Sequence, residues 1–284
     1  MERKEIQAFQ RQMLRDVAQL CEKHHIRYTI YCGTLLGAVR HGGFIPWDDD
    51  VDIAMPLKDY YRFLRYARRE LKEKYFAQNF LSDPRVNILW TQLRANHTTE
   101  MRRELMAWKK HWGINIDIYP MLGAAEDDRA FARQKRALQL AETFLATDYA
   151  RLIGATSAGW QVVIDRLPAR LRSWIAYLFM LYAQRDPDRS KWVCTLDAAP
   201  FERKFLGRDW DEMIWGDFDG LRVRMPAAYD KLLRRMYGDY MALPPEEKRN
   251  GHGDAYGGMI WDSRRDYKEY QRELAAAAGA DGKK

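Results

Sequence analysis

Cysteine and long hydrophobic runs are scarce in this sequence of 284 residues. Its three cysteines, Cys21, Cys32 and Cys194, are odd in number and widely spaced, so they form neither a disulfide framework nor a metal-binding motif. A chain so poor in cysteine is typical of a reducing compartment, and we therefore expect a cytoplasmic protein. The charged residues 1–5 also lack the apolar segment of a signal peptide.

The longest apolar run, residues 174–183, contains tyrosines and is far shorter than the roughly 20 residues of a membrane-spanning helix. The sequence thus allows at most peripheral contact with a membrane, at its inner face. Zinc-finger spacing and an aromatic RNA-binding signature are also missing, so we expect no nucleic-acid partner. The 47 Lys and Arg residues exceed the 40 Asp and Glu residues, and this excess suits anionic partners such as nucleotides, acidic glycans or a membrane surface.

Hydrophobic patterning predicts an α+β protein, because segments of helical and of strand periodicity are interspersed. Helices are predicted over residues 2–24, 33–40, 57–74 and 227–236. Gly238 follows the last of these helices and can cap it. Strands are predicted over residues 28–31, 51–55, 86–93 and 113–119, and residues 200–225 are rich in β and turn signals.

The same patterns predict three units along the chain. Residues 1–125 and 200–262 together form the unit that carries the strands. Residues 126–199 form a helical insertion, since their pattern is helical, with no strand signal up to residue 183. The tail, residues 263–284, is polar or rich in alanine, and we expect it to fray beyond Leu274.

Four carboxylates lie within five positions, at Asp48, Asp49, Asp50 and Asp52, after a turn with glycine and proline and before an apolar run. Two carboxylates about 4 Å apart repel by roughly 4 kcal/mol at an effective dielectric near 20. A fold keeps such a cluster only if solvent, basic side chains or a cation offset the repulsion. Asp50 and Asp52 are one residue apart and would share a face of an extended strand, which suits a divalent cation held by oxygen ligands.

A solvated turn and a calcium loop fit the acidic cluster less well. A solvated acidic turn is at odds with the apolar strand that follows at once. A calcium loop of the EF-hand type matches Asp48, Asp50 and Asp52 at its first three ligand positions. It fails at Ile53, where glycine is needed, and at Asp59, where glutamate is usual.

Further candidates lie outside the cluster. Asp117 faces away from the isoleucines of its strand; it is either a solvent-facing residue or a third carboxylate for two ions about 3.5–4 Å apart. Gly33 and Thr34 form either a simple turn or a helix N-terminus that offers backbone N–H groups to a phosphate. Arg40, His41, Arg249 and His252 are candidate contacts to an anionic donor, although charged loops are often only solvated.

A Gly-Thr turn, a helix, an Asp-x-Asp strand and a third Asp resemble the nucleotidyltransferase superfamily of the DNA polymerase β type. Within it, residues 33–39, 40–53 with the run Pro-Trp-Asp-Asp-Asp-Val-Asp, 116–120 and 237–245 together resemble the LicD family, relatives of fukutin. The resemblance covers about residues 18–125 and 200–255. It implies a nucleotidyltransferase-like mixed sheet that is flanked by helices and interrupted by a helical insertion.

The resemblance also implies an activity. LicD-type enzymes transfer a phospho-alcohol, commonly phosphocholine from CDP-choline, to a hydroxyl of a cell-surface glycan such as lipopolysaccharide or teichoic acid, free or lipid-linked. Mg²⁺ or Mn²⁺ would be the cofactor. By this resemblance Asp50 and Asp52 would hold the cation on the donor, Asp117 would be a third ligand or the base for the acceptor, and Asp48 would be a ligand or support the others. The cysteines do not provide the zinc site of some fukutin relatives.

Two alternatives of other classes stay open. An enzyme of the same fold could transfer a nucleotidyl group to a small molecule and release pyrophosphate instead of CMP. A non-enzymatic module could instead bind a membrane or a glycan through its helical middle, if that helix is not simply part of the core. The residues that motivate the module are Arg166, Arg170, Arg172, Leu171, Trp174 and Ile175.

Overall fold

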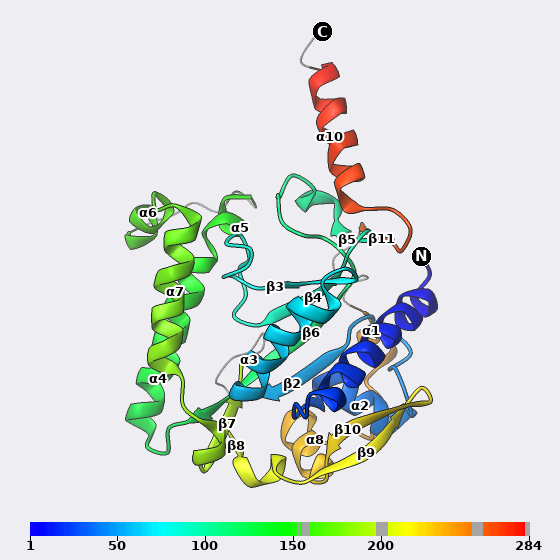
Figure 1. Ribbon diagram of the computed structural model, residues 1–284, viewed down its shortest axis with the longest axis vertical. Helices are drawn as coiled ribbons and strands as arrows, with labels where there is room; N and C mark the ends of the chain where they lie inside the picture. Colours follow the sequence, from blue (N-terminus) through cyan, green and yellow to red (C-terminus); the bar gives the residue numbers. More distant parts are fainter. Residues whose placement is uncertain (153, 155–158, 197–203, 252–257, 282–284) are drawn as a thin grey trace.

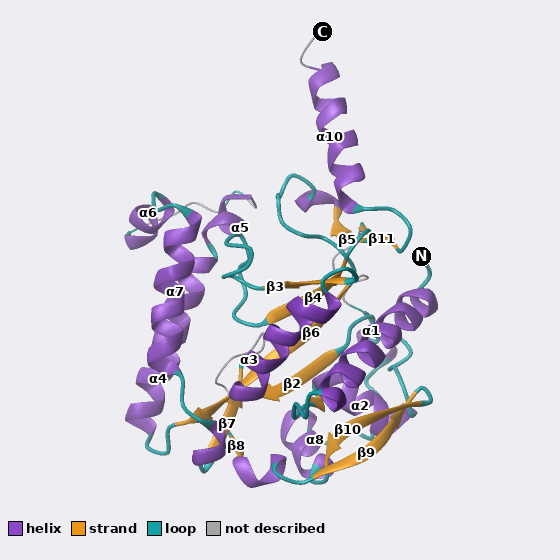
Figure 2. Cartoon of the chain, in the orientation of Figure 1, coloured by secondary structure: helices purple, strands orange, loops and turns teal. Residues whose placement is uncertain are grey.

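A curved seven-stranded sheet lies at the centre of the computed structural model, which describes residues 1–152, 154, 159–196, 204–251 and 258–281 (Figures 1 and 2). Its main path runs β1(Thr29–Ile30), β2(Asp52–Pro56), β6(Asn115–Ala124), β4(Thr91–Ala95) and β3(Tyr75–Gln78). The far half of β6 also pairs with β7(Trp192–Thr195), and β7 pairs with β8(Phe205–Leu206). Because β2 and β6 are parallel and the other neighbours antiparallel, the sheet is mixed, and the predicted α+β class is confirmed.

Helices cover this sheet on the side that faces the viewer in Figure 1. The helix predicted over residues 2–24 is α1(Arg3–Lys23), and it crosses the sheet beside α3(Leu57–Tyr66). At the lower edge α2(Cys32–His41) lies against α8(Tyr229–Tyr237) and the hairpin of β9(Met213–Phe218) and β10(Leu221–Pro226). Gly238 follows α8 with φ +70°, so the predicted glycine cap is confirmed.

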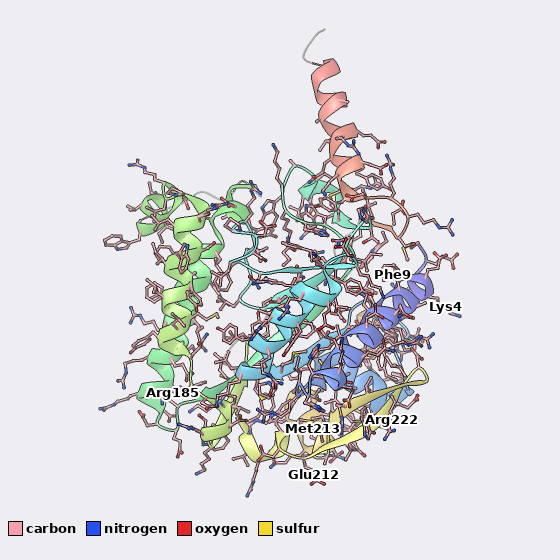
Figure 3. All side chains as sticks on the ribbon, in the orientation of Figure 1. Lys4, Phe9, Arg185, Glu212, Met213 and Arg222 are labelled. Carbon is pink, nitrogen blue, oxygen red and sulfur yellow. The ribbon has the colours of Figure 1, made fainter. Side chains whose placement is uncertain are left out.

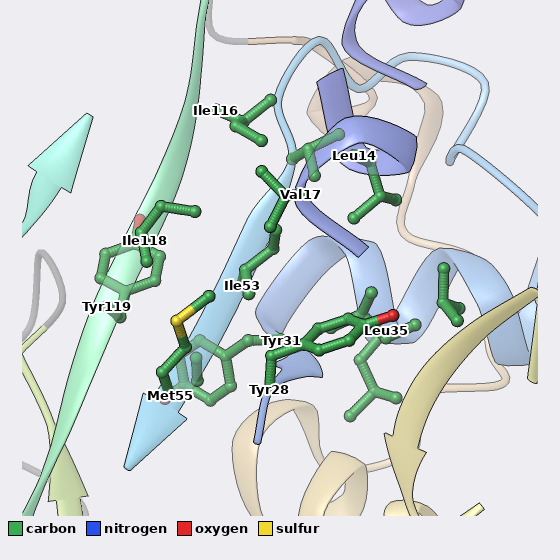
Figure 4. Packing of buried hydrophobic residues seen from close by; sticks show 14 of the residues in the cluster. Leu14, Val17, Tyr28, Tyr31, Leu35, Ile53, Met55, Ile116, Ile118 and Tyr119 are labelled. Carbon is green, nitrogen blue, oxygen red and sulfur yellow. The ribbon is translucent and has the colours of Figure 1, made fainter. Parts of the chain in front are cut away.

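The main core lies between the sheet and these helices. Figure 4 shows its centre, where side chains of α1, α2, β1, β2 and β6 meet: Leu14, Val17, Tyr28, Tyr31, Leu35, Ile53, Met55, Ile116, Ile118 and Tyr119. Ile116 and Ile118 are fully buried, as their alternation predicts. Phe218 and Leu233 join the same cluster, so the hairpin and α8 share one core with the first third of the chain.

A pair of antiparallel helices stands at the side of the sheet. They are α4(Asp128–Leu145) and α7(Ala169–Ala183), and they are connected through the short α5(Thr147–Leu152) and α6(Trp160–Asp165) (Figure 1). Leu138 and Met180 pack with Leu122 of β6 and Cys194 of β7 in a second cluster. The interval 126–199 therefore supplies strand β7 to the central sheet as well as these helices.

Several predicted boundaries are wrong. The helix predicted over 57–74 continues past α3 only as a π-helical turn, η1(Ala67–Leu71), because the aromatic-led β3 then pairs with β4. The strand predicted over 86–93 begins at Thr91, after two turns. At the C-terminal end, α10(Tyr267–Asp281) continues past Leu274 through four alanines, the residue of highest helix propensity, and the expected fraying stays a prediction.

Short elements complete the described part of the chain. β5(Thr99–Arg102) pairs with β11(Met259–Asp262) beneath α10, a pairing that sequence patterning did not predict. The 3₁₀ turns are η2(Arg103–Leu105), η3(Pro187–Arg189), η4(Gly207–Trp210) and η5(Glu246–Lys248). Among the described residues, no helix combines the length and apolar character that a membrane crossing requires.

Candidate active site

Asp52 and Asp117 lie side by side on the two parallel strands at the centre of the sheet. Asp52 is the first residue of β2, and Asp117 is its partner in the register of β6. The hydroxyl of Tyr119 lies 3.1 Å from Asp52 Oδ1 and 3.2 Å from Asp117 Oδ2. Since a hydroxyl carries one proton, it donates to one carboxylate at a time. Asp117 also accepts from Asn115 Nδ2 at 3.4 Å and from the side chain of Gln92.

Burial and mutual repulsion dominate the electrostatics of this pair. Asp52 is only 5% exposed; burial raises its pKa well above the usual range, and the charges of Asp50, Asp117 and Asp48 raise it further. Burial and the charge of Asp50 also raise the pKa of Asp117 to about 6. Four carboxylates thus act on one another here, and a cation that binds them would relieve both the repulsion and the desolvation.

The start of α2 brings Asp48 over the same site. A Cβ at Gly33 would lie 2.8 Å from Asp48 Oδ2 and 4.0 Å from Asp52 Oδ2, so only glycine lets these carboxylates approach the backbone. The backbone N–H of Asp52 donates to Thr34 Oγ1 at 2.8 Å, which fixes the first residue of β2 to α2. Asp50 precedes β2. Strand alternation therefore does not put its side chain on the same face as that of Asp52, contrary to the prediction.

Contacts from distant segments hold the loop between α2 and β2. The tip of the β9–β10 hairpin reaches it, because the backbone N–H of Asp219 donates to the Gly42 carbonyl at 2.8 Å. From α1, Gln10 Nε2 donates to the Asp49 carbonyl at 2.9 Å. Asp49 itself is 4% exposed. The acidic loop is therefore a packed segment rather than a solvated turn.

The basic residues predicted to bind substrate lie around this loop, with their nearest contacts inside the protein. Arg40 Nη1 donates to the Tyr240 carbonyl at 2.7 Å, and its Nε donates to His41 Nε2 at 3.0 Å. Burial and the Arg40 charge lower the pKa of His41. Arg249 Nε donates to the Pro244 carbonyl at 2.8 Å, and its guanidinium lies 5.5 Å from the centre of the Trp47 ring. His252 lies outside the described residues.

Three residues that sequence reasoning did not select also lie at the site. Tyr119 lies two positions after Asp117, so strand alternation would have placed both on one face. The hydroxyl of Tyr237 is close enough for Cys32 and Asp52 to raise its pKa, after burial itself. Arg94 is buried near Asp117, where Nη1 donates to the Gly113 carbonyl at 2.7 Å. Tyr237 begins the segment 237–245 that carries part of the LicD resemblance, although no role is predicted for it there, and nothing in the sequence pattern indicates Arg94.

The donor set fits a hard divalent cation, because the converging side chains are carboxylates. Within the part of the chain that the structure describes, no three His, Cys, Asp or Glu side chains are arranged to hold a metal ion by themselves. Mg²⁺ commonly takes one or two carboxylates and fills its shell with water and substrate phosphates. The four-residue metal set of Asp48, Asp50, Asp52 and Asp117 stays a prediction.

Comparison with known proteins adds independent information on this site. Residues 25–146, which carry all four of these carboxylates, match the family model described as "LicD/FKTN/FKRP, nucleotidyltransferase domain". This stretch of the chain is similar to the LicD family. The resemblance predicted from the sequence is thereby confirmed.

Individual relatives agree with this family. LicD of Haemophilus influenzae, a lipopolysaccharide cholinephosphotransferase, is 25% identical over 246 residues, which cover 82% of this chain and 89% of LicD. Ribitol 5-phosphate transferase FKRP of mouse and of human is 47% identical over 49 residues, 17% of this chain and 10% of FKRP. An uncharacterised protein of Rickettsia typhi is 50% identical over 52 residues, 18% of this chain and 17% of that protein.

Proposed function

We propose that this LicD-domain protein is a metal-dependent transferase with a nucleotidyltransferase-like fold. It moves a phospho-alcohol, in the first instance phosphocholine, from a CDP-linked donor to a hydroxyl of a glycan of the lipopolysaccharide or teichoic acid type. The observation that carries the proposal is the pairing of Asp52 and Asp117 on adjacent parallel strands beside one tyrosine hydroxyl. The name of the H. influenzae relative supports the phosphocholine group and the lipopolysaccharide acceptor.

The carboxylates of Asp52, Asp50 and Asp48 are proposed to hold Mg²⁺ or Mn²⁺ on the pyrophosphate of the donor. A bound cation of this kind neutralises the charge that the leaving CMP gains. Gly33 contributes by its missing side chain, since it leaves room for the Asp48 carboxylate above the start of α2. The N-terminus of α2, with Gly33 and Thr34, is proposed to contribute backbone N–H groups to a phosphate oxygen of the donor.

Asp117 is proposed to accept the proton of the acceptor hydroxyl. The acceptor oxygen forms a bond to the phosphorus of the phospho-alcohol, and the bond from that phosphorus to the bridging oxygen of CMP breaks. The hydroxyl proton passes to the Asp117 carboxylate, and CMP leaves. A pKa of about 6 lies near the pH of most cytoplasms, which is where a general base is most effective.

Product analysis tests this proposal. The purified protein is incubated with CDP-choline, CDP-ribitol or CDP-glycerol, with Mg²⁺ or Mn²⁺ and with lipopolysaccharide or teichoic acid as acceptor. Release of CMP that needs both the cation and the acceptor supports phospho-alcohol transfer, and the productive donor names the alcohol. Release of pyrophosphate from a nucleoside triphosphate, without CMP from any CDP-alcohol, would instead establish nucleotidyl transfer.

A further inference from the structure

The outer face of the α4–α7 pair exposes large apolar side chains although its inner face is packed. On α7, Ala176 and Met180 are buried against α4 and the sheet, whereas Trp174 is 60%, Leu178 61% and Tyr182 69% exposed. The helix predicted as part of either the core or an interface thus has one face in the core and one exposed apolar face. The 15 residues of α7 are too few to span a bilayer, which needs about 20.

A groove of about 480 Å³ runs between the two helices on this outer face. Its walls are apolar, and its rim on the α4 side carries two arginines. The residues that line the groove include Leu140, Ile175, Leu178, Tyr182, Arg133 and Arg136. An apolar groove of this kind, left open to solvent, marks a binding surface.

The charged side chains that line the groove, Arg133 and Arg136, are both basic, whereas the acidic residues of α4 and α6, Asp128, Glu142 and Asp165, lie outside its lining. Residues 166–185 contain four arginines and no carboxylate, and residues 129–141 contain three arginines and one lysine, again without a carboxylate. Arg172 is buried and pairs with Asp148 at 2.6 Å, which removes it from the surface. The others on α7 and its flanks are exposed, from Arg166 and Arg170 to Arg185 below the end of α7 (Figure 3).

Exposed apolar side chains continue at the other end of the pair. In α6, which lies beside the start of α7 in Figure 1, Trp160 is 84% and Val163 53% exposed. Tryptophan and arginine together are typical of helices that lie in the interface of a membrane, where the ring enters the headgroup layer and the guanidinium pairs with phosphates.

We propose that the outer face of α4, α6 and α7 docks the protein onto a membrane surface rich in anionic phospholipid. Trp174, Leu178 and Tyr182 enter the interfacial layer, the groove takes part of an acyl chain, and the surrounding arginines bind lipid phosphates. The two arginines that line the groove favour this occupant, since an anionic surface complements their charge. The inference does not depend on the proposed transfer reaction.

Vesicle binding tests the docking surface. The intact protein is sedimented with vesicles of phosphatidylcholine alone or with about one third phosphatidylglycerol. We expect binding to the anionic vesicles, weakened by salt, and a loss of affinity of at least about tenfold in Leu178→Glu and in the double variant Arg133→Glu/Arg136→Glu. Leu81→Glu is the matched control, because Leu81 is 46% exposed on a loop outside this face.

Two results would overturn the docking surface. One is that the Leu178→Glu and Leu81→Glu variants bind anionic vesicles with equal affinity, since the apolar face would then play no part in binding. The other result has two parts: the parent protein does not bind vesicles, and light scattering shows that it forms a dimer that Leu178→Glu dissociates. A second copy of the chain would then cover the face. Transfer to a detergent-free soluble acceptor is expected to be unchanged in Leu178→Glu, which separates this test from that of the proposed function.

Discussion

At the scale of single residues, the site is defined by a conflict that the fold itself does not resolve. Asp52 is buried beside Asp117, and the hydroxyl of Tyr119 lies within hydrogen-bond distance of both carboxylates, although Asp117 also accepts from Asn115. Asp50 and Asp48 add further negative charge. Buried charges are normally paired, so we expect such a cluster to destabilise the free protein and to favour a bound cation.

Replacing Asp52 by Asn is expected to stabilise the protein while it weakens cation binding. The change removes a buried charge, so the free energy of unfolding should rise by about 1 kcal/mol or more in the absence of metal. Affinity for Mn²⁺ in the presence of CDP-choline should fall at least about tenfold. Thermal unfolding and Mn²⁺ electron spin resonance measure the two effects, with exposed Asp211→Asn as control. Loss of folding in Asp52→Asn would show that the cluster is structural.

Tyr119→Phe is expected to lower the turnover number and leave donor affinity nearly unchanged. The lost hydrogen bond to a carboxylate corresponds to about 1.5–3 kcal/mol, or roughly a tenfold to hundredfold decrease. Tyr75→Phe is a matched control, because the hydroxyl of Tyr75 donates to Asp16 at 2.9 Å, away from the site. It should lower stability and not turnover. Equal turnover in the two variants would contradict a role for Tyr119 in the reaction.

Glu100 predicts a pH dependence of stability. Burial raises its pKa from 4.5 in the unfolded chain to about 7. The folded protein therefore keeps this proton longer than the unfolded chain does, and the Glu100 contribution to stability is lost as the pH rises from 4.5 to 7. Glu100→Gln should match the parent at pH 4 and exceed its unfolding free energy by about 1–3 kcal/mol at pH 8. Denaturant unfolding at pH 4 and pH 8 measures this difference. An unfolding free energy of Glu100→Gln that differs from that of the parent by the same amount at both pH values would contradict the prediction.

At the scale of elements, α2 links the acidic loop to the sheet through two glycines that face different neighbours. A Cβ at Gly33 would meet a side-chain oxygen, that of Asp48. A Cβ at Gly37 would come 2.4 Å from the backbone oxygen of Gly43. A carboxylate can turn away from an added methyl group, whereas a packed backbone cannot move without loss of its own contacts.

The two glycines of α2 should therefore respond differently to alanine. Gly33→Ala is expected to keep the melting temperature or raise it, since alanine favours helices by about 1 kcal/mol, and to lose activity as Asp48 is displaced. Gly37→Ala is expected to lower the melting temperature by several degrees. Melting curves and CMP release of both variants give the comparison. Full activity of the Gly33→Ala variant would show that the position of Asp48 is not needed for the reaction.

The elements that sequence patterning predicted well are those with local signals. α1 shows a long apolar stripe, and the Ile114, Ile116 and Ile118 alternation marks β6. β3 was missed because residues 67–74 continue a helical pattern and only pairing with β4 decides otherwise. β5 was missed for the same reason, since its partner β11 lies more than 150 residues away.

The same distinction holds for the site. The acidic run and Asp117 are visible in the sequence because their residue types are rare before and within apolar strands. The places of Tyr237 and Arg94 beside Asp52 and Asp117 cannot be predicted from the sequence pattern, because only the packing of α8 against α2 and of β4 against β6 brings them there. Patterns indicate which residues do chemistry, and tertiary contacts decide which others surround them.

At the scale of the whole molecule, the site depends on contacts between the first and last thirds of the chain. Arg40 at the end of α2 binds the carbonyls of Tyr240 and Ala242, at 2.7 and 3.4 Å. A Cβ at Gly251 would lie 2.5 Å from the carbonyl oxygen of Trp47, so this segment also packs on the acidic loop. The segment after α8 therefore forms one wall of the site.

Arg40→Met is expected to loosen the segment after α8. Without the guanidinium, the two carbonyls lose their donor, and trypsin should cleave after Lys248 or Arg249 several times faster than in the parent protein. Limited proteolysis followed by mass spectrometry measures the rates, with Arg208→Met, an exposed arginine of η4, as the control. Unchanged cleavage together with weaker donor binding would instead make Arg40 a direct contact to the donor.

The measurement that tests the account most directly is CMP release from CDP-choline in the presence of lipopolysaccharide, for the parent protein and for Asp52→Asn. We expect the parent to release CMP with Mg²⁺ or Mn²⁺ and to stop when a chelator is added. We expect no release above background from folded Asp52→Asn. CMP release that continues in folded Asp52→Asn, or that ignores the chelator, would contradict a metal-dependent transferase built on Asp52 and Asp117.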